Sequence, residues 1–344
     1  MTDRARGGTL IPVTPIRARL SGREVRSIGI FLAITFGLAW LISLPLWLGD
    51  GLDDPNFLAY AVVTMTTPAI AALIMVFFVD RERHKARMLG LWPVKPVGRF
   101  VKYCLLGIFV PIALVLSSLL VGAMLGVYPA DFVNFSGFEL DLAQRAKANG
   151  TALPAIPLGT LVVLQLVMLP VAAFINIIPS LGEELGWRGW LFPKLMPLGA
   201  VPAIVISGII WGLWHAPLLL LGYNYPGSPG WLGLILMVGM CIVVGAIFGW
   251  LRLRSNSVWP ATLAHGAFNA AGGTMIIFSM AGEYIDRTQA TMLGWSGWIV
   301  PLALAIVLFA TGQFRSPTAT PTAVEAAPAD LVAAGSASNE RNQE

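Results

Sequence analysis

Long apolar segments dominate this sequence, and each is near the ~20 residues that a helix needs to cross a bilayer. We place them at 28–48, 57–79, 103–127, 160–190, 201–221, 231–251, 258–280 and 293–312. Hydrophobic residues make up 56% of the 344 positions and charged residues only 12%, about half the charged share of a soluble domain. Unpaired backbone groups are costly in lipid, so these segments should be helical. The sequence predicts an all-α, polytopic membrane bundle of about eight transmembrane helices.

The distribution of Lys and Arg predicts how the bundle is oriented. Bases are frequent in residues 1–26 and again between Arg81 and Arg87, whereas the loop 49–56 has three aspartates and no base. We therefore expect the first segment to stay uncleaved and both termini to be cytoplasmic, in a bacterial inner (plasma) membrane. The net charge of +4 fits this topology and does not call for a nucleic-acid partner.

Four regions follow from this pattern. Residues 1–26 form a basic cytoplasmic segment, 27–153 hold helices one to three and an outer loop, and 154–312 hold the remaining five helices. Residues 313–344, rich in Ala, Pro, Ser and Thr, are expected to form a disordered cytoplasmic tail. The apolar stretch from Pro154 to Pro193 is too long for one span, which leaves either a tilted, kinked helix or a short helix joined to a spanning one.

Three ionisable residues lie together in that stretch: Glu183, Glu184 and Arg188. Unpaired at membrane depth they would cost on the order of 8–10 kcal/mol, so pairing must offset part of this. Glu184 and Arg188 are four residues apart and share a helix face, whereas Glu183 points elsewhere. A structural clamp explains one carboxylate, and two neighbouring carboxylates are typical of a general acid or base. Both interpretations remain open for this cluster alone.

Two further polar pairs have the same spacing, Trp211 with His215 and His265 with Asn269. Each pair alone would be read as an interhelical hydrogen bond. Together with the glutamates they occupy three neighbouring segments, which favours one buried, hydrated site. A carboxylate and an imidazole can deprotonate water, and a second His with an amide can stabilise an oxyanion. A zinc site made of Glu183, His215 and His265 is the alternative.

These three motifs, Glu183-Glu184-x-x-x-Arg188, Trp211-x-x-x-His215 and His265-x-x-x-Asn269, resemble those of the CPBP family. This family comprises the CAAX prenyl endopeptidases and bacteriocin-processing enzymes, also called the Abi or type II CAAX proteases. The resemblance covers about residues 154–269. It implies an eight-helix bundle around an intramembrane cavity open to the cytoplasm.

The resemblance also implies roles for the motif residues. Glu183 and His215 would activate water, His265 and Asn269 would form the oxyanion hole, and Glu184 and Arg188 would support the site. The family usually has Phe where this chain has Trp211, a difference that bears on the shape of the pocket. No cofactor is expected, although a divalent metal such as Zn is an alternative. The expected partners are the bilayer and a peptide or lipidated protein substrate.

The first hypothesis is therefore an intramembrane endopeptidase that cleaves a membrane-associated substrate, of CAAX-like or bacteriocin or leader type, near the cytoplasmic face. A non-enzymatic immunity or adaptor protein that uses the same polar cluster is the second. A proton-coupled transporter is the third, and the lack of an inverted repeat argues against it. All three hypotheses require one cavity to reach both histidines. However, His215 lies about 21 Å along its segment and His265 only about 10 Å along its own, so the two differ in expected depth.

Overall fold

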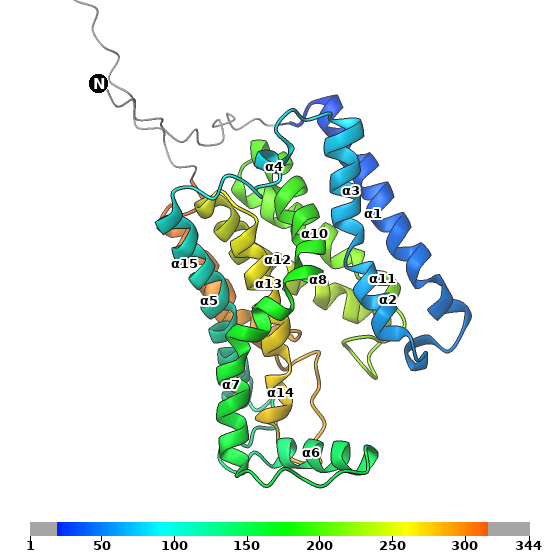
Figure 1. Ribbon diagram of the computed structural model, residues 1–344, viewed down its shortest axis with the longest axis vertical. Coiled ribbons are helices and arrows are strands. Elements are labelled where there is room, and N and C mark those ends of the chain that lie inside the picture. Colours follow the sequence, from blue (N-terminus) through cyan, green and yellow to red (C-terminus); the bar gives the residue numbers. More distant parts are fainter. Residues whose placement is uncertain (1–18, 316–344) are drawn as a thin grey trace, which may run out of the picture.

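The computed structural model describes residues 19–315, and within them the chain is a helix bundle whose β-structure is limited to one isolated bridge, between Ala130 and Ser279 (Figure 1). The all-α prediction is confirmed. All but residues 313–315 of the predicted disordered tail, and most of the basic N-terminal segment, lie outside the described residues.

Five helical segments in the described part of the chain are long and apolar enough to cross a membrane. They are Gly22–Leu48 (α1), Phe57–Val79, Val97–Met124 (α5), Leu158–Ile175 (α7) and Gly230–Ser255 (α12). The second combines α2 (Phe57–Thr64), α3 (Thr67–Ile74) and a π-helical end, η2 (Met75–Val79).

The other predicted segments are also helical but shorter. Ala200–Trp214 (α10) continues after His215 into Ala216–Leu219 (α11), and Trp259–Gly272 (α13) continues into Thr274–Ile277 (α14). The last segment consists of Trp295–Trp298 (η5) and Ile299–Ala310 (α15). The prediction of a multi-pass membrane bundle is therefore confirmed. The lengths of the helices do not by themselves give eight full spans.

The stretch from Pro154 to Pro193 is a broken helix. The spanning helix α7 ends at Ile175, and after Asn176 the chain continues as α8 (Ile177–Glu184), the π-helix η3 (Leu185–Leu191) and α9 (Phe192–Leu195). Of the two geometries that the sequence left open, the structure adopts a spanning helix joined to shorter pieces. Short π-helical turns often mark functional sites, and this one begins directly after the paired glutamates.

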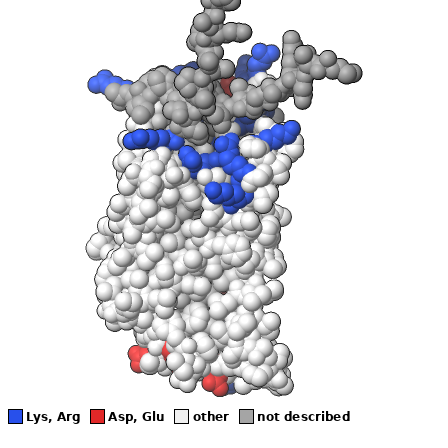
Figure 2. Space-filling model, turned by 90° about the vertical axis from the view of Figure 1, so that its left-hand side faces the viewer, with Lys and Arg blue, Asp and Glu red and all other residues white. Residues whose placement is uncertain are grey.

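Charged residues separate toward the two ends of the bundle. Figure 2 shows Lys and Arg gathered at one end, Asp and Glu at the other, and an uncharged band between them. The basic end carries α4 (Lys85–Met88) and the start of α5. The opposite, acidic end carries the loop 49–56 and α6 (Ser136–Ala148), a helix within the outer loop that the sequence pattern did not indicate.

Glycines bring the helices around the site into close contact, as small residues do in membrane bundles. A Cβ atom on Gly212 of α10 would lie 2.5 Å from the Cα atom of Val238 on α12. A Cβ atom on Gly182 of α8 would lie 2.7 Å from the carbonyl oxygen of Met65. The segment with the paired glutamates is thus pressed directly against the second membrane segment.

The start of α13 lies inside the bundle. Gly90 accepts hydrogen bonds from the Val258 N–H and the Ser257 hydroxyl, both at 3.0 Å, and Leu91 accepts one from the Trp259 indole at 3.2 Å. The segment 88–91 therefore covers the turn between α12 and α13. A helix that begins below the surface brings His265 to the depth of His215, which resolves the difficulty noted above.

Candidate functional site

One cavity of about 560 Å³ brings the four predicted catalytic residues together. Glu183 comes from α8, His215 follows α10, and His265 and Asn269 come from α13; all four line the cavity. Three separate chain segments thus converge, as the sequence predicted. Asn269 lies one turn beyond His265 and its side chain is exposed to the cavity.

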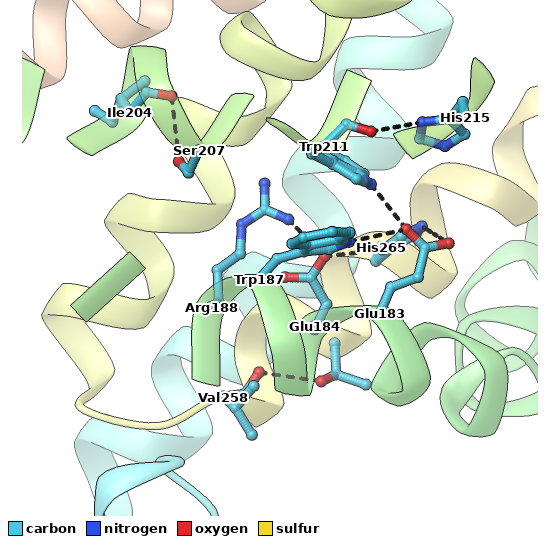
Figure 3. Close-up of polar contacts among 11 residues, drawn as sticks. Glu183, Glu184, Trp187, Arg188, Ile204, Ser207, Trp211, His215, Val258 and His265 are labelled. Atoms are coloured by element: carbon cyan, nitrogen blue, oxygen red, sulfur yellow. Dashed lines mark hydrogen bonds and ion pairs between the residues drawn. The ribbon is translucent and has the colours of Figure 1, made fainter. Parts of the chain in front are cut away.

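Glu183 is buried, and its carboxylate is held by two indoles (Figure 3). Its Oε2 atom accepts a hydrogen bond from Trp211 Nε1 at 2.8 Å and a longer one from Trp187 Nε1 at 3.4 Å. The other oxygen, Oε1, lies 3.9 Å from His265 Nε2. One oxygen is therefore fixed by neutral donors, while the other remains available on the cavity side.

Glu184 makes the contacts of a supporting residue. Its Oε1 atom accepts from Arg188 Nη1 at 2.8 Å and contacts His265 Nδ1 at 2.9 Å. The Arg188 guanidinium lies 4.3 Å from the centre of the Trp211 ring, a cation–π distance. The expected i,i+4 ion pair is therefore present. It also contacts both other motifs, because Arg188 lies over Trp211 and Glu184 contacts His265.

The two histidines have different hydrogen-bonding constraints. His215 Nδ1 lies 2.9 Å from the carbonyl oxygen of Trp211. A carbonyl only accepts, so Nδ1 carries the proton and Nε2 has the lone pair in the neutral ring. His265 Nδ1 likewise donates to the Glu184 carboxylate, so its Nε2 atom donates only when both ring nitrogens are protonated.

Three contributors to the site were missed by sequence reasoning. The Trp187 indole contacts Glu183 from the next turn of the helix, a spacing that could have revealed it. Trp211 was expected only to shape the pocket, yet it donates the shorter hydrogen bond to that carboxylate. Arg252, read only as a marker of topology, is 1% exposed and donates from Nε to the Arg188 carbonyl at 3.0 Å.

The residues considered for zinc do not have the arrangement of a metal site. Within residues 19–315, no three His, Cys, Asp or Glu side chains are grouped so that they could hold a metal ion. We therefore derive no reaction step through a metal.

Ser296 lies in a GxSG pattern, Gly294-Trp295-Ser296-Gly297, but it is not placed as a nucleophile. Ser296 is fully buried and its hydroxyl donates to the Gln289 carbonyl at 2.5 Å. It does not line the cavity. The serine supports the fold of the loop and does not enter the candidate site.

The cavity extends toward the acidic end of the bundle. Its further lining includes residues of α2, the loop at Tyr223 and Asn224, and the segment Arg287 to Leu293. None of the described lining residues belongs to the basic-end loops. Two expectations therefore conflict, because the cavity cannot open to the cytoplasm if the basic end faces the cytoplasm.

Comparison with known proteins gives concordant results. Residues 162–271, which include all four cavity residues named above, match the family described as type II CAAX prenyl endopeptidase Rce1-like. CAAX prenyl protease 2 of Methanococcus maripaludis is 27% identical over 147 residues, which cover 41% of this chain and 50% of that protein. The chain thus spans about half the length of the curated relative it matches. The segment that carries the three motifs is thus similar to the type II CAAX prenyl endopeptidases, the family that the motifs resemble.

Proposed function

We propose that this protein is an intramembrane endopeptidase that hydrolyses a peptide bond of a membrane-associated substrate. The observation that carries the proposal is the convergence of Glu183, His215, His265 and Asn269 on one cavity. Independent structural hydrogen bonds would not require these groups to face the same space.

In the proposed reaction, a water molecule lies between the free oxygen of Glu183 and Nε2 of His215. Glu183 takes a proton from the water as the water oxygen attacks the carbonyl carbon, and His215 orients the water through its lone pair. The two indoles on Oε2 fix the carboxylate, which leaves Oε1 for the proton transfer. Glu183 then delivers that proton to the amine as the C–N bond breaks.

The negative charge that develops on the carbonyl oxygen requires donors. The Asn269 amide supplies one, and Nε2 of His265 supplies the other when its ring is doubly protonated. Glu184 accepts from the opposite nitrogen of that ring and so fixes its orientation. Arg188 in turn holds Glu184, which makes both of them positioning residues.

The family resemblance supports two substrate types, a CAAX-like C-terminus and a bacteriocin or leader peptide. A comparison of membrane peptides from cells with wild-type protein and with Glu183→Gln tests the proposal and identifies the substrate. We expect specific fragments that are present in the wild type and absent in the variant. Glu139→Gln, a change in the outer-loop helix α6, serves as the matched control and should give the wild-type pattern.

The alternative is a non-enzymatic immunity or adaptor protein. It is favoured if Glu183→Gln complements a deletion fully while its fold and abundance are unchanged. Identical peptide profiles in wild type and Glu183→Gln would also contradict proteolysis.

A further inference from the structure

The cavity has a chemically distinct deep end and mouth. The deep end holds Glu183 and the two histidines, whereas the mouth is formed by residues of the acidic end. Leu58 and Tyr223, both at the mouth, are 72% and 36% exposed. The cavity volume of about 560 Å³ leaves room for groups larger than water.

The opposite route, from the basic end, is closed by a buried aromatic layer. Phe31 stacks on Trp190 with ring centres 4.7 Å apart and meets Trp187 edge-on at 5.9 Å. None of these three rings is more than 1% exposed. The layer lies on the basic side of Glu183, because Trp190 donates to Asp80, the residue that directly precedes the basic loop starting at Arg81.

Polar contacts lock this layer at the basic end. The Asp80 carboxylate accepts from Ser27 at 2.9 Å and from the Trp190 indole at 3.1 Å, and it pairs with Lys194 at 3.0 Å. Three chain segments are thus joined around one carboxylate. A passage from this side would require breaking the whole cluster.

The charge asymmetry assigns the two ends to the two sides of the membrane. The basic end carries a dense set of cations, Arg81, Arg83, Lys85, Arg87, Lys95, Arg99, Lys102, Arg252 and Arg254. The acidic end includes the loop 49–56 with Asp50, Asp53 and Asp54. Loops rich in Lys and Arg remain cytoplasmic. The mouth of the cavity then faces the extracytoplasmic side.

One cation stands at the mouth. Among the described residues that line the cavity, Arg287 is the sole Lys or Arg. It has no ion pair within residues 19–315, and its hydrogen bond to the Asn224 carbonyl is long at 3.5 Å. Burial lowers the pKa of the Arg287 guanidinium from its ordinary value, but an arginine stays charged at neutral pH. A partly desolvated cation without a carboxylate partner will attract anions.

We propose that substrate enters this cavity from the extracytoplasmic side, and that Arg287 at the mouth binds an anionic group of the peptide. The substrate class would be exported peptide segments with an acidic side chain or a free C-terminal carboxylate near the cleaved bond. The claim that the entering peptide is cleaved rests on the proposed function, whereas the direction of access does not depend on catalysis.

Cysteine labelling tests the direction of access independently of proteolysis. Cys104 and Cys241 are replaced by Ala, and Asn269→Cys is introduced deep in the cavity. Membrane-impermeant methanethiosulfonates are then applied to spheroplasts, which expose the outer face, and to inverted vesicles, which expose the cytoplasmic face. Ala86→Cys reports the basic end and Asp53→Cys the acidic end, both positions being exposed.

We expect Asn269→Cys and Asp53→Cys to react in spheroplasts and Ala86→Cys to react only in inverted vesicles. Reaction of Asn269→Cys only in inverted vesicles, or in neither preparation, overturns the proposal. Labelling is unaffected if the protein proves not to be a protease, so the two failures are distinguishable.

The role of Arg287 is tested with the same cysteine. A sulfonate reagent and a trimethylammonium reagent are compared, and Arg287→Gln should lower the anionic-to-cationic rate ratio by about 2–10-fold. Arg145→Gln is the matched control, since Arg145 is also at the acidic end but pairs with Asp141 and does not line the cavity. An unchanged ratio in Arg287→Gln contradicts the assignment of Arg287.

Discussion

Replacing Arg188 with Met should destabilise the protein far more than the same change at Arg145. Both arginines pair with a carboxylate four residues earlier, at 2.8 Å for Glu184 and 2.7 Å for Asp141. The difference is burial: Arg188 and Glu184 are 4% and 0% exposed, and Arg145 and Asp141 are 70% and 28% exposed. Water replaces a lost partner only in the second pair.

The magnitude follows from that difference. Removing one partner of a buried pair leaves an uncompensated charge, which costs about 3–5 kcal/mol. Glu184 would retain only His265 as a partner, because its Oε2 atom is buried with no hydrogen bond in the described part of the chain. The free energy of unfolding of Arg188→Met should fall by about this amount, and that of Arg145→Met should not change measurably.

The assay is reversible unfolding of purified protein in mixed micelles by SDS, followed by far-UV circular dichroism. The double variant Glu184→Gln with Arg188→Met removes both charges and should recover most of the loss, because the amide oxygen still accepts from His265 Nδ1. Equal effects of Arg188→Met and Arg145→Met would refute the reasoning. So would a double variant less stable than Arg188→Met alone.

Three further outcomes are expected. Trp211→Phe keeps an aromatic ring but removes the indole donor at 2.8 Å from Glu183. Because a hydrogen bond to a charged group is worth about 1.5–3 kcal/mol, kcat should fall about 10- to 150-fold. An unchanged kcat would argue against a catalytic role of this contact. Gly107→Ala places a Cβ atom against the Pro260 carbonyl, whereas a Cβ atom on Gly98 of the same helix would meet open space. Because of this overpacking, Gly107→Ala should lower the free energy of unfolding by about 1–3 kcal/mol in the same SDS titration. Gly98→Ala should leave it unchanged. If water is activated without a metal, dialysis against 1,10-phenanthroline should leave the hydrolysis rate unchanged, and loss of activity restored by Zn²⁺ would contradict that mechanism.

The membrane bundle and the pairing of Glu184 with Arg188 could be predicted from local features alone. Apolar runs report bilayer length, and a four-residue spacing places two side chains on one helix face wherever the helix lies. The convergence of the three motifs was also predictable, because isolated ionisable groups in lipid are too costly to leave unpaired.

What could not be predicted depends on contacts between segments distant in sequence. The indole of Trp211 on α10 donates to Glu183 on α8. Arg252 on α12 donates to the backbone carbonyl of Arg188. The break at Asn176 and the π-helix after Glu184 depend on tertiary packing against the second membrane segment. The set of residues that line the cavity depends on the same contacts between distant segments.

The central claim is that Glu183 and His215 activate a water molecule for peptide hydrolysis. Its most direct test is single-turnover cleavage, in proteoliposomes, of the peptide identified from the membrane comparison. Wild-type protein and Glu139→Gln should cleave it at equal rates, and Glu183→Gln and His215→Ala should lose activity by at least about 100-fold. Cleavage by Glu183→Gln or His215→Ala at the wild-type rate would contradict the account.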